Sequence, residues 1–74
     1  MQITVKLFAS FRAGRFIREN REVAAGTSVA QVADALGIAL SEIGIIMING
    51  RHAEAEQELH DGATLSLFPL LGGG

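Results

Sequence analysis

The chain has 74 residues, of which 49% are hydrophobic and 19% charged, with a net charge of −2 and no cysteine. This length allows one domain, too small to hold both a core and a deep substrate cleft. The composition excludes a disulfide framework, a thiol nucleophile and a thiolate metal site, and no apolar run approaches the roughly 20 residues of a membrane-spanning helix.

The charges are unevenly distributed. Residues 1–21 hold five basic residues and one acid, whereas residues 22–74 hold one basic residue and seven acids. The acidic chain as a whole argues against nucleic acid as the main partner, although the basic first third could steer an acidic protein partner. A solvated hairpin face is the alternative that the sequence favours. The N-terminus has no signal-peptide pattern, so we expect a cytoplasmic protein with no membrane partner.

The first predicted element is a strand over Gln2–Phe8. Ile3, Val5 and Leu7 alternate with polar positions, which is typical of a strand with one buried face. Residues 9–15 predict a loop, and Phe16–Val23 predicts a second, more highly charged strand. Together these segments predict an N-terminal hairpin.

A helix is predicted next. Ser28 and Gln31 have the spacing of a capping box. The apolar residues then follow at helical spacing, giving one stripe formed by Val29, Val32, Ala33 and Leu36. Gly37 suits the left-handed position that ends a helix.

The middle of the chain predicts a second hairpin. Residues 38–44 read as an irregular crossing with one helical turn near residues 41–43. Ile45–Ile48 is a short apolar run typical of a central strand. Asn49-Gly50 is a strong hairpin signal, and Arg51–Ala53 predicts a brief return strand.

The last strand completes the predicted sheet. Residues 55–60 form a polar loop, Asp61-Gly62 predicts a turn, and Ala63–Phe68 alternates again. One helix across a mixed sheet of four or five strands is the α+β arrangement that buries both apolar faces. In that arrangement the first and last strands can lie side by side, and the tail leaves from a central strand.

Conventional catalytic and metal-binding groups are scarce. His52 and His60 are the only histidines, and both lie near predicted turns. The alternating Glu54, Glu56 and Glu58 favour a solvated acidic edge over a site. No serine has a nearby base, so the sequence predicts no catalytic residue, no metal site and no bound cofactor.

The C-terminal tail is the strongest functional candidate. We divide the chain into a domain, residues 1–69, and a tail, residues 70–74. Three closing glycines cannot pack and predict a mobile segment. Leu70 and Leu71 beside it suggest recognition by a partner, and Pro69 is expected to end strand pairing. An inert tail is the alternative.

A terminal Gly-Gly has a chemical logic. A carboxylate at Gly74 becomes reactive when it is activated, for example as an acyl-adenylate made from ATP. Gly72 and Gly73 lack the Cβ that would obstruct threading through a narrow enzyme channel. Sulfur attack on the adenylate would give a thiocarboxylate, and amine attack would give an amide.

Two aromatic residues predict a binding surface. Phe8 and Phe68 share the parity of the polar positions in their strands, so both are expected to face away from the helix. If the two strands are neighbours, the rings meet on an exposed sheet face. The alternative is that Phe8 turns inward, whereas Phe11 and Phe16 are expected to pack in the core or a loop.

Several motifs appear in a familiar order. Asn49-Gly50-Arg51 precedes Leu59-His60-Asp61-Gly62-Ala63, and Leu67-Phe68-Pro69 leads to the closing glycines. In this order the chain resembles the β-grasp sulfur carriers over nearly its whole length. The segment from Thr64 to Gly74 also has the layout of the last strand and tail of ubiquitin. The resemblance therefore implies a β-grasp (ubiquitin-like) fold.

Within that family, the small subunit of molybdopterin synthase is the most similar. Leu67-Phe68-Pro69 and the segment Phe8-Ala9-Ser10-Phe11-Arg12 resemble that subunit more than the thiamine sulfur carrier. The tail, Leu70-Leu71-Gly72-Gly73-Gly74, departs from the usual Pro-Val-x-Gly-Gly, so the acceptor pathway stays open.

The resemblance implies a non-enzymatic carrier. A ubiquitin-activating-like adenylyltransferase would consume ATP to adenylate Gly74, sulfur would be transferred, and a larger synthase subunit would accept it for molybdopterin. Phe8, Phe68, Pro69, Leu70 and Leu71 would contact these partners. Alternatives are sulfur carriage for thiamine or another metabolite, a ubiquitin-like modifier of lysines, and a pure interaction module with an incidental tail.

Overall fold

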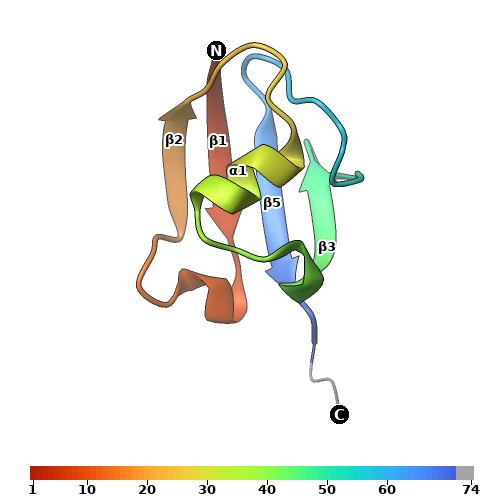
Figure 1. The fold of residues 1–74 in the computed structure, drawn as a ribbon. Coiled ribbons are helices and arrows are strands. Elements are labelled where there is room, and N and C mark those ends of the chain that lie inside the picture. The colour runs from red at the N-terminus through yellow and green to blue at the C-terminus, as the bar shows by residue number, and fades with distance from the viewer. Residues whose placement is uncertain (72–74) are drawn as a thin grey trace.

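The computed structural model describes residues 1–71. Within that range the chain forms five strands, one α-helix and two short 3₁₀ turns (Figure 1). In chain order the elements are β1 (Gln2–Leu7), η1 (Ala9–Arg12), β2 (Arg18–Glu22), α1 (Val29–Ala35), η2 (Leu40–Glu42), β3 (Ile43–Ile48), β4 (Arg51–His52) and β5 (Thr64–Pro69).

The strands form one mixed sheet. Its order is β2-β1-β5-β3-β4, so the last strand lies at the centre. β1 and β5 pair in parallel, and every other pair is antiparallel. Figure 1 shows α1 crossing one face of this sheet. The predicted fold class and the predicted neighbourhood of the first and last strands are confirmed.

Local interactions begin and end α1 as predicted. Gln31 N–H donates to Ser28 Oγ at 3.3 Å, and Ser28 N–H donates to Gln31 Oε1 at 2.8 Å. The capping box therefore satisfies two N–H groups of the first turn. At the other end Gly37 has a φ of +73°, and its N–H donates to Asp34 O at 3.0 Å. A left-handed residue at this position turns the chain out of the helix.

Two turns are tied to the central strands. Asn49 and Gly50 have φ values of +52° and +78°, the pairing that a two-residue hairpin requires. Asn49 Oδ1 accepts a hydrogen bond from Thr64 N–H at 2.9 Å, which holds the hairpin to β5. Asp61 Oδ1 accepts from Gln2 N–H at 2.8 Å and so holds the second turn to β1. The predicted turns are confirmed.

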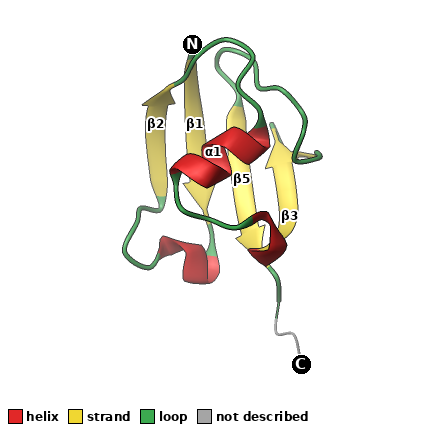
Figure 2. Ribbon diagram, viewed as in Figure 1, coloured by secondary structure: helices red, strands yellow, loops and turns green. Residues whose placement is uncertain are grey.

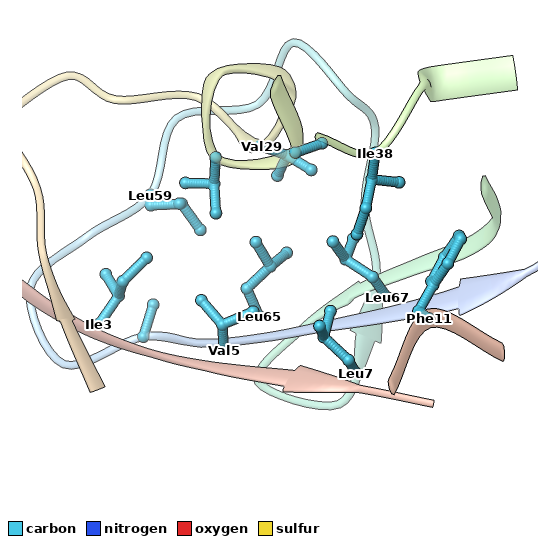
Figure 3. Close-up of a cluster of buried hydrophobic side chains, with 12 residues drawn as sticks. Ile3, Val5, Leu7, Phe11, Val29, Ile38, Leu59, Leu65 and Leu67 are labelled. Carbon is cyan, nitrogen blue, oxygen red and sulfur yellow. The ribbon is translucent and has the colours of Figure 1, made fainter. Parts of the chain in front are cut away.

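The core lies between the sheet and α1. Figure 3 shows side chains from β1 and β5 pointing toward the helix and Leu59. The buried hydrophobic residues are Ile3, Val5, Leu7, Phe11, Val29, Val32, Ala33, Ile38, Leu59, Ala63, Leu65 and Leu67. Phe16 packs against this cluster while partly exposed. The core or loop packing expected of Phe11 and Phe16 is therefore confirmed.

Some element bounds differ from the prediction. β2 is shorter than the predicted strand, and β4 has two residues. β3 begins at Ile43, before the predicted start at Ile45, because a bulge at Gly44 lets pairing with β5 continue. The predicted helical turn is η2, which lies one residue earlier than expected.

Candidate functional site

Parallel pairing brings two aromatic rings together at the sheet end from which the tail leaves. Leu7 pairs with Leu67, so the next residues, Phe8 and Phe68, are neighbours. Their ring centroids lie 4.1 Å apart with planes inclined by 12°, a stacked arrangement. The prediction that both rings face away from the helix is confirmed, and the alternative of an inward Phe8 is wrong. Their role in binding a partner stays a prediction.

The same face carries two apolar side chains from β3. Ile45 pairs with Phe68 and Met47 pairs with Ser66, so both point away from α1. Both are partly exposed. We call Phe8, Phe68, Ile45 and Met47 the outer strip. It crosses three adjacent strands, and exposed apolar surface arranged in this way is typical of a protein contact.

The sequence interpretation missed half of the outer strip. Ile45–Ile48 was predicted only as a central strand, with no residue assigned to either face, and Ile46 and Ile48 are the residues of this run that pack against the core. The two-residue period of a strand is the signal that could have found the other two, since Ile45 and Met47 are two residues apart and therefore lie on the same face. Which face that is could be assigned only with the pairing of β3 known.

Three cations flank the outer strip at the β1–β2 edge. Lys6 and Arg18 are cross-strand partners, and Arg12 places its guanidinium carbon 5.3 Å from the centre of the Phe8 ring. With Phe8 and Ile17 they line an open hollow of about 310 Å³. Ile17 is 62% exposed. We call Lys6, Arg12 and Arg18 the cation cluster.

The cation cluster has no acidic counterpart among residues 1–71. The ion pairs in that range join the N-terminal amine to Glu22 and Arg21 to Glu19. Lys6 and Arg18 are like charges that face each other across strands and therefore repel, and no ion pair offsets this repulsion within the described residues. Arg12 and Arg18 are exposed beside an open hollow, and both readings of these residues, a solvated face and a surface that steers an acidic partner, stay predictions.

The tail root, Pro69 and Leu70, lies against the start of β3. Pro69 still pairs with Ile43, and Leu70 N–H donates to Glu42 O at 3.0 Å. β5 ends at Pro69, so the expectation that this residue ends strand pairing is confirmed, and its own backbone remains in register beside the bulge although proline lacks an N–H. Figure 2 shows both 3₁₀ turns at this end of the sheet.

The tail side chains that the structure describes are exposed. Leu70 is 62% and Leu71 82% exposed, and their role in binding a partner stays a prediction. Gly72, Gly73 and Gly74, the predicted threading and attachment residues, lie outside the described residues. The boundary between residues 1–69 and 70–74 stays a prediction.

The remaining candidates form no recognisable site. His52 and His60 lie exposed on separate segments, and Glu54, Glu56 and Glu58 are solvated. Within residues 1–71 no three His, Asp or Glu side chains are close enough to hold a metal ion. No helix in the same range is long and apolar enough to cross a membrane. The site is therefore a surface, made of the outer strip, the cation cluster and the tail root.

A comparison with protein families matches residues 5–74 to the ThiS family. The chain belongs to the ThiS family. The match includes the strands that carry the outer strip and continues through the closing glycines. The resemblance to β-grasp sulfur carriers is thereby confirmed. Curated protein sequences give no significant match.

Solved structures show the same β-grasp fold. SAMP1 from Haloferax volcanii is 25% identical with a TM-score of 0.77, and the alignment covers 100% of each chain. A putative molybdopterin converting factor, subunit 1, from Pyrococcus furiosus is 25% identical with a TM-score of 0.74, covering 93% of this chain and 97% of that one.

A third structure shares the fold alone. It is a complex of subunits 1 and 2 of the molybdopterin-converting factor from Helicobacter pylori. The matched chain is 18% identical with a TM-score of 0.68, and both chains are covered completely.

Proposed function

We propose that this protein is a sulfur carrier for molybdopterin biosynthesis. A partner enzyme adenylates Gly74, sulfur replaces the adenylate, and the resulting thiocarboxylate donates its sulfur to a pterin precursor. The protein supplies recognition and reach, and its own side chains perform no catalysis. Membership of the ThiS family supports carriage through the tail. The similarity to a converting factor subunit supports the molybdopterin branch.

The observation that carries the proposal is the position of the tail root. Leu70 leaves the central strand at the end where Phe8 and Phe68 stack. A partner that covers the outer strip therefore already holds the origin of the tail. Binding energy from docking can then orient the terminal carboxylate for attack, which lowers the entropic part of the barrier.

The chemistry balances without a side chain of this protein. A carboxylate oxygen of Gly74 attacks the α-phosphorus of ATP, and pyrophosphate leaves. A sulfide sulfur then attacks the carbonyl carbon, the carbon–oxygen bond to AMP breaks, and AMP leaves with the electron pair. The product is the thiocarboxylate. Two partners follow from this scheme: an ATP-dependent, ubiquitin-activating-like adenylyltransferase and a larger synthase subunit.

Intact mass spectrometry tests the proposal. The protein is incubated with ATP, sulfide and its activating enzyme, and we expect one oxygen to be replaced by one sulfur. A variant lacking Gly73 and Gly74 serves as the control and should keep its mass. As a positive control, the same activating enzyme must convert a known carrier protein. If it does so while the mass of this full chain stays unchanged, carriage of sulfur through this tail is excluded.

A second function has specific support. A Haloferax volcanii relative is a small archaeal modifier protein, 25% identical with a TM-score of 0.73. In a modifier, the same adenylate would pass to a lysine amine and form an amide. Adducts of higher mass in cells, lost when Gly73 and Gly74 are deleted, would identify this use. A thiamine acceptor would instead be revealed by a requirement for the protein in thiazole synthesis.

A further inference from the structure

Gly44 occupies an unusual place beside the tail root. It is the extra residue of the bulge, since Ile43 pairs with Pro69 and Ile45 pairs with Phe68. In contrast to the turn glycines 14, 26, 37, 50 and 62, it has no positive φ. Backbone conformation therefore does not explain the glycine at this position.

Space explains it. A Cβ built on Gly44 would lie 2.9 Å from Pro69 O, 3.1 Å from Leu70 Cα and 3.2 Å from Leu70 N. All three neighbours are backbone atoms, so no side-chain rotation can relieve the contact. A Cβ at any of the turn glycines would meet nothing within 4 Å.

A hydrogen bond made by Leu70 also keeps the tail root close to the chain just before Gly44. Leu70 N–H donates to Glu42 O at 3.0 Å, two residues before Gly44. The tail root thus meets the chain at two nearby points, a hydrogen bond to the last residue of η2 and a contact at Gly44 of β3 that only glycine allows. Two fixed points on one segment determine the direction in which the chain continues.

We infer that Gly44 is a positioning residue that sets the direction in which the tail leaves the sheet. The inference rests on the proposed function, because exit direction matters only if the tail end must enter a partner's active site. The outer strip anchors the domain, and Gly44 orients the tail root relative to that anchor.

The size of the effect follows from the contact distances. Ordinary contact begins at 3.4 Å, so an added Cβ must move the backbone of Pro69 away by about 0.5 Å. Because Pro69 and Leu70 form the tail root, this shift moves the point from which the tail leaves the sheet. Misplacement of a reacting group by about 1 Å can cost up to about a hundredfold in rate. We therefore expect Gly44→Ala to lower kcat for adenylation at least about tenfold, with KM unchanged because docking through the outer strip is intact.

Two measurements separate positioning from lost stability. Val32→Ala removes buried side-chain volume from α1, away from the tail root, and controls for destabilisation. One extra glycine between Leu71 and Gly72 adds about 3.5 Å of reach. It should restore much of the kcat of Gly44→Ala, and the same insertion in the natural sequence is its control.

Hydrogen exchange of the Leu70 amide provides a readout independent of activity. In the natural protein this amide should be protected by its bond to Glu42, and in Gly44→Ala it should exchange faster. Faster exchange, a lower kcat at constant KM and recovery by the insertion together support the inference. Unchanged Leu70 exchange, an equal loss in Val32→Ala, or a loss that the insertion leaves intact would overturn it.

Failure of the proposed function gives a different result. The natural protein would then show no adenylation with any activating enzyme, whereas the Leu70 amide would still report whether Gly44 holds the tail root.

Discussion

Replacing Phe68 by alanine removes one ring of the stacked pair and leaves a gap between Phe8 and Ile45 on the outer face. Phe68 is partly exposed and lies opposite Ile45, beside the tail root. Its loss should therefore affect partner docking more than folding. The core face of β5, made by Leu65 and Leu67, is untouched.

The magnitude follows from two separate contributions. An aromatic stack contributes about 0.5–1.5 kcal/mol beyond its buried area, so Phe68→Ala should lower the free energy of unfolding by about 1–2 kcal/mol. A central aromatic residue in a protein interface typically contributes about 2 kcal/mol or more to binding. That corresponds to a rise of about thirtyfold in the Kd for the activating enzyme.

Isothermal titration calorimetry of the full chain with the activating enzyme measures docking, and urea unfolding measures stability. Thr4→Ala is the matched control, because Thr4 lies on the same face at the far end of β1 and bonds Asn20 Oδ1 at 3.0 Å. A Kd that stays within about threefold of the natural value in Phe68→Ala, or that rises equally in Thr4→Ala, would refute the outer strip as the docking face.

Three further predictions concern charge and local structure. Replacing Lys6 and Arg18 by glutamine should slow association with an acidic partner about tenfold at low salt and flatten its salt dependence, as stopped-flow fluorescence would measure; equal rates would exclude steering by the cation cluster. Ser28→Ala should lower the free energy of unfolding by about 1 kcal/mol through the lost cap, measured by urea unfolding, and no loss would contradict the capping box. Asn49→Ala should lower it by about 1–2 kcal/mol because alanine is strained at a positive φ, and Asn49→Gly, which lacks that strain, should lose less in the same assay.

Local features of this protein were predictable because their causes lie within a few residues. The capping box joins Ser28 to Gln31, and Gly37 ends the helix through bonds to its own last turn. Asn49-Gly50 sets a hairpin by its own backbone preference. The tail stays a prediction, because Gly72, Gly73 and Gly74 lie outside the described residues.

The stacking of Phe8 and Phe68 was predictable only in part. The period of two predicted the face of each ring, but their stacking needed β1 and β5 to be parallel neighbours, 60 residues apart in sequence. The sequence made that pairing an expectation. The observed register, in which Leu7 pairs with Leu67, brings the two rings into contact.

By itself, the sequence determined the helix and its ends, the turns, the alternation of each strand and the candidate tail, because each depends on short-range bonding or on residue chemistry. The tertiary structure alone decided that Ile45 and Met47 join the outer strip and that Lys6, Arg12 and Arg18 cluster at its edge. It alone placed Gly44 against the tail root. These features arise from long-range strand pairing and from one bulge, and a bulge shifts every later side chain to the opposite face without leaving a local signal.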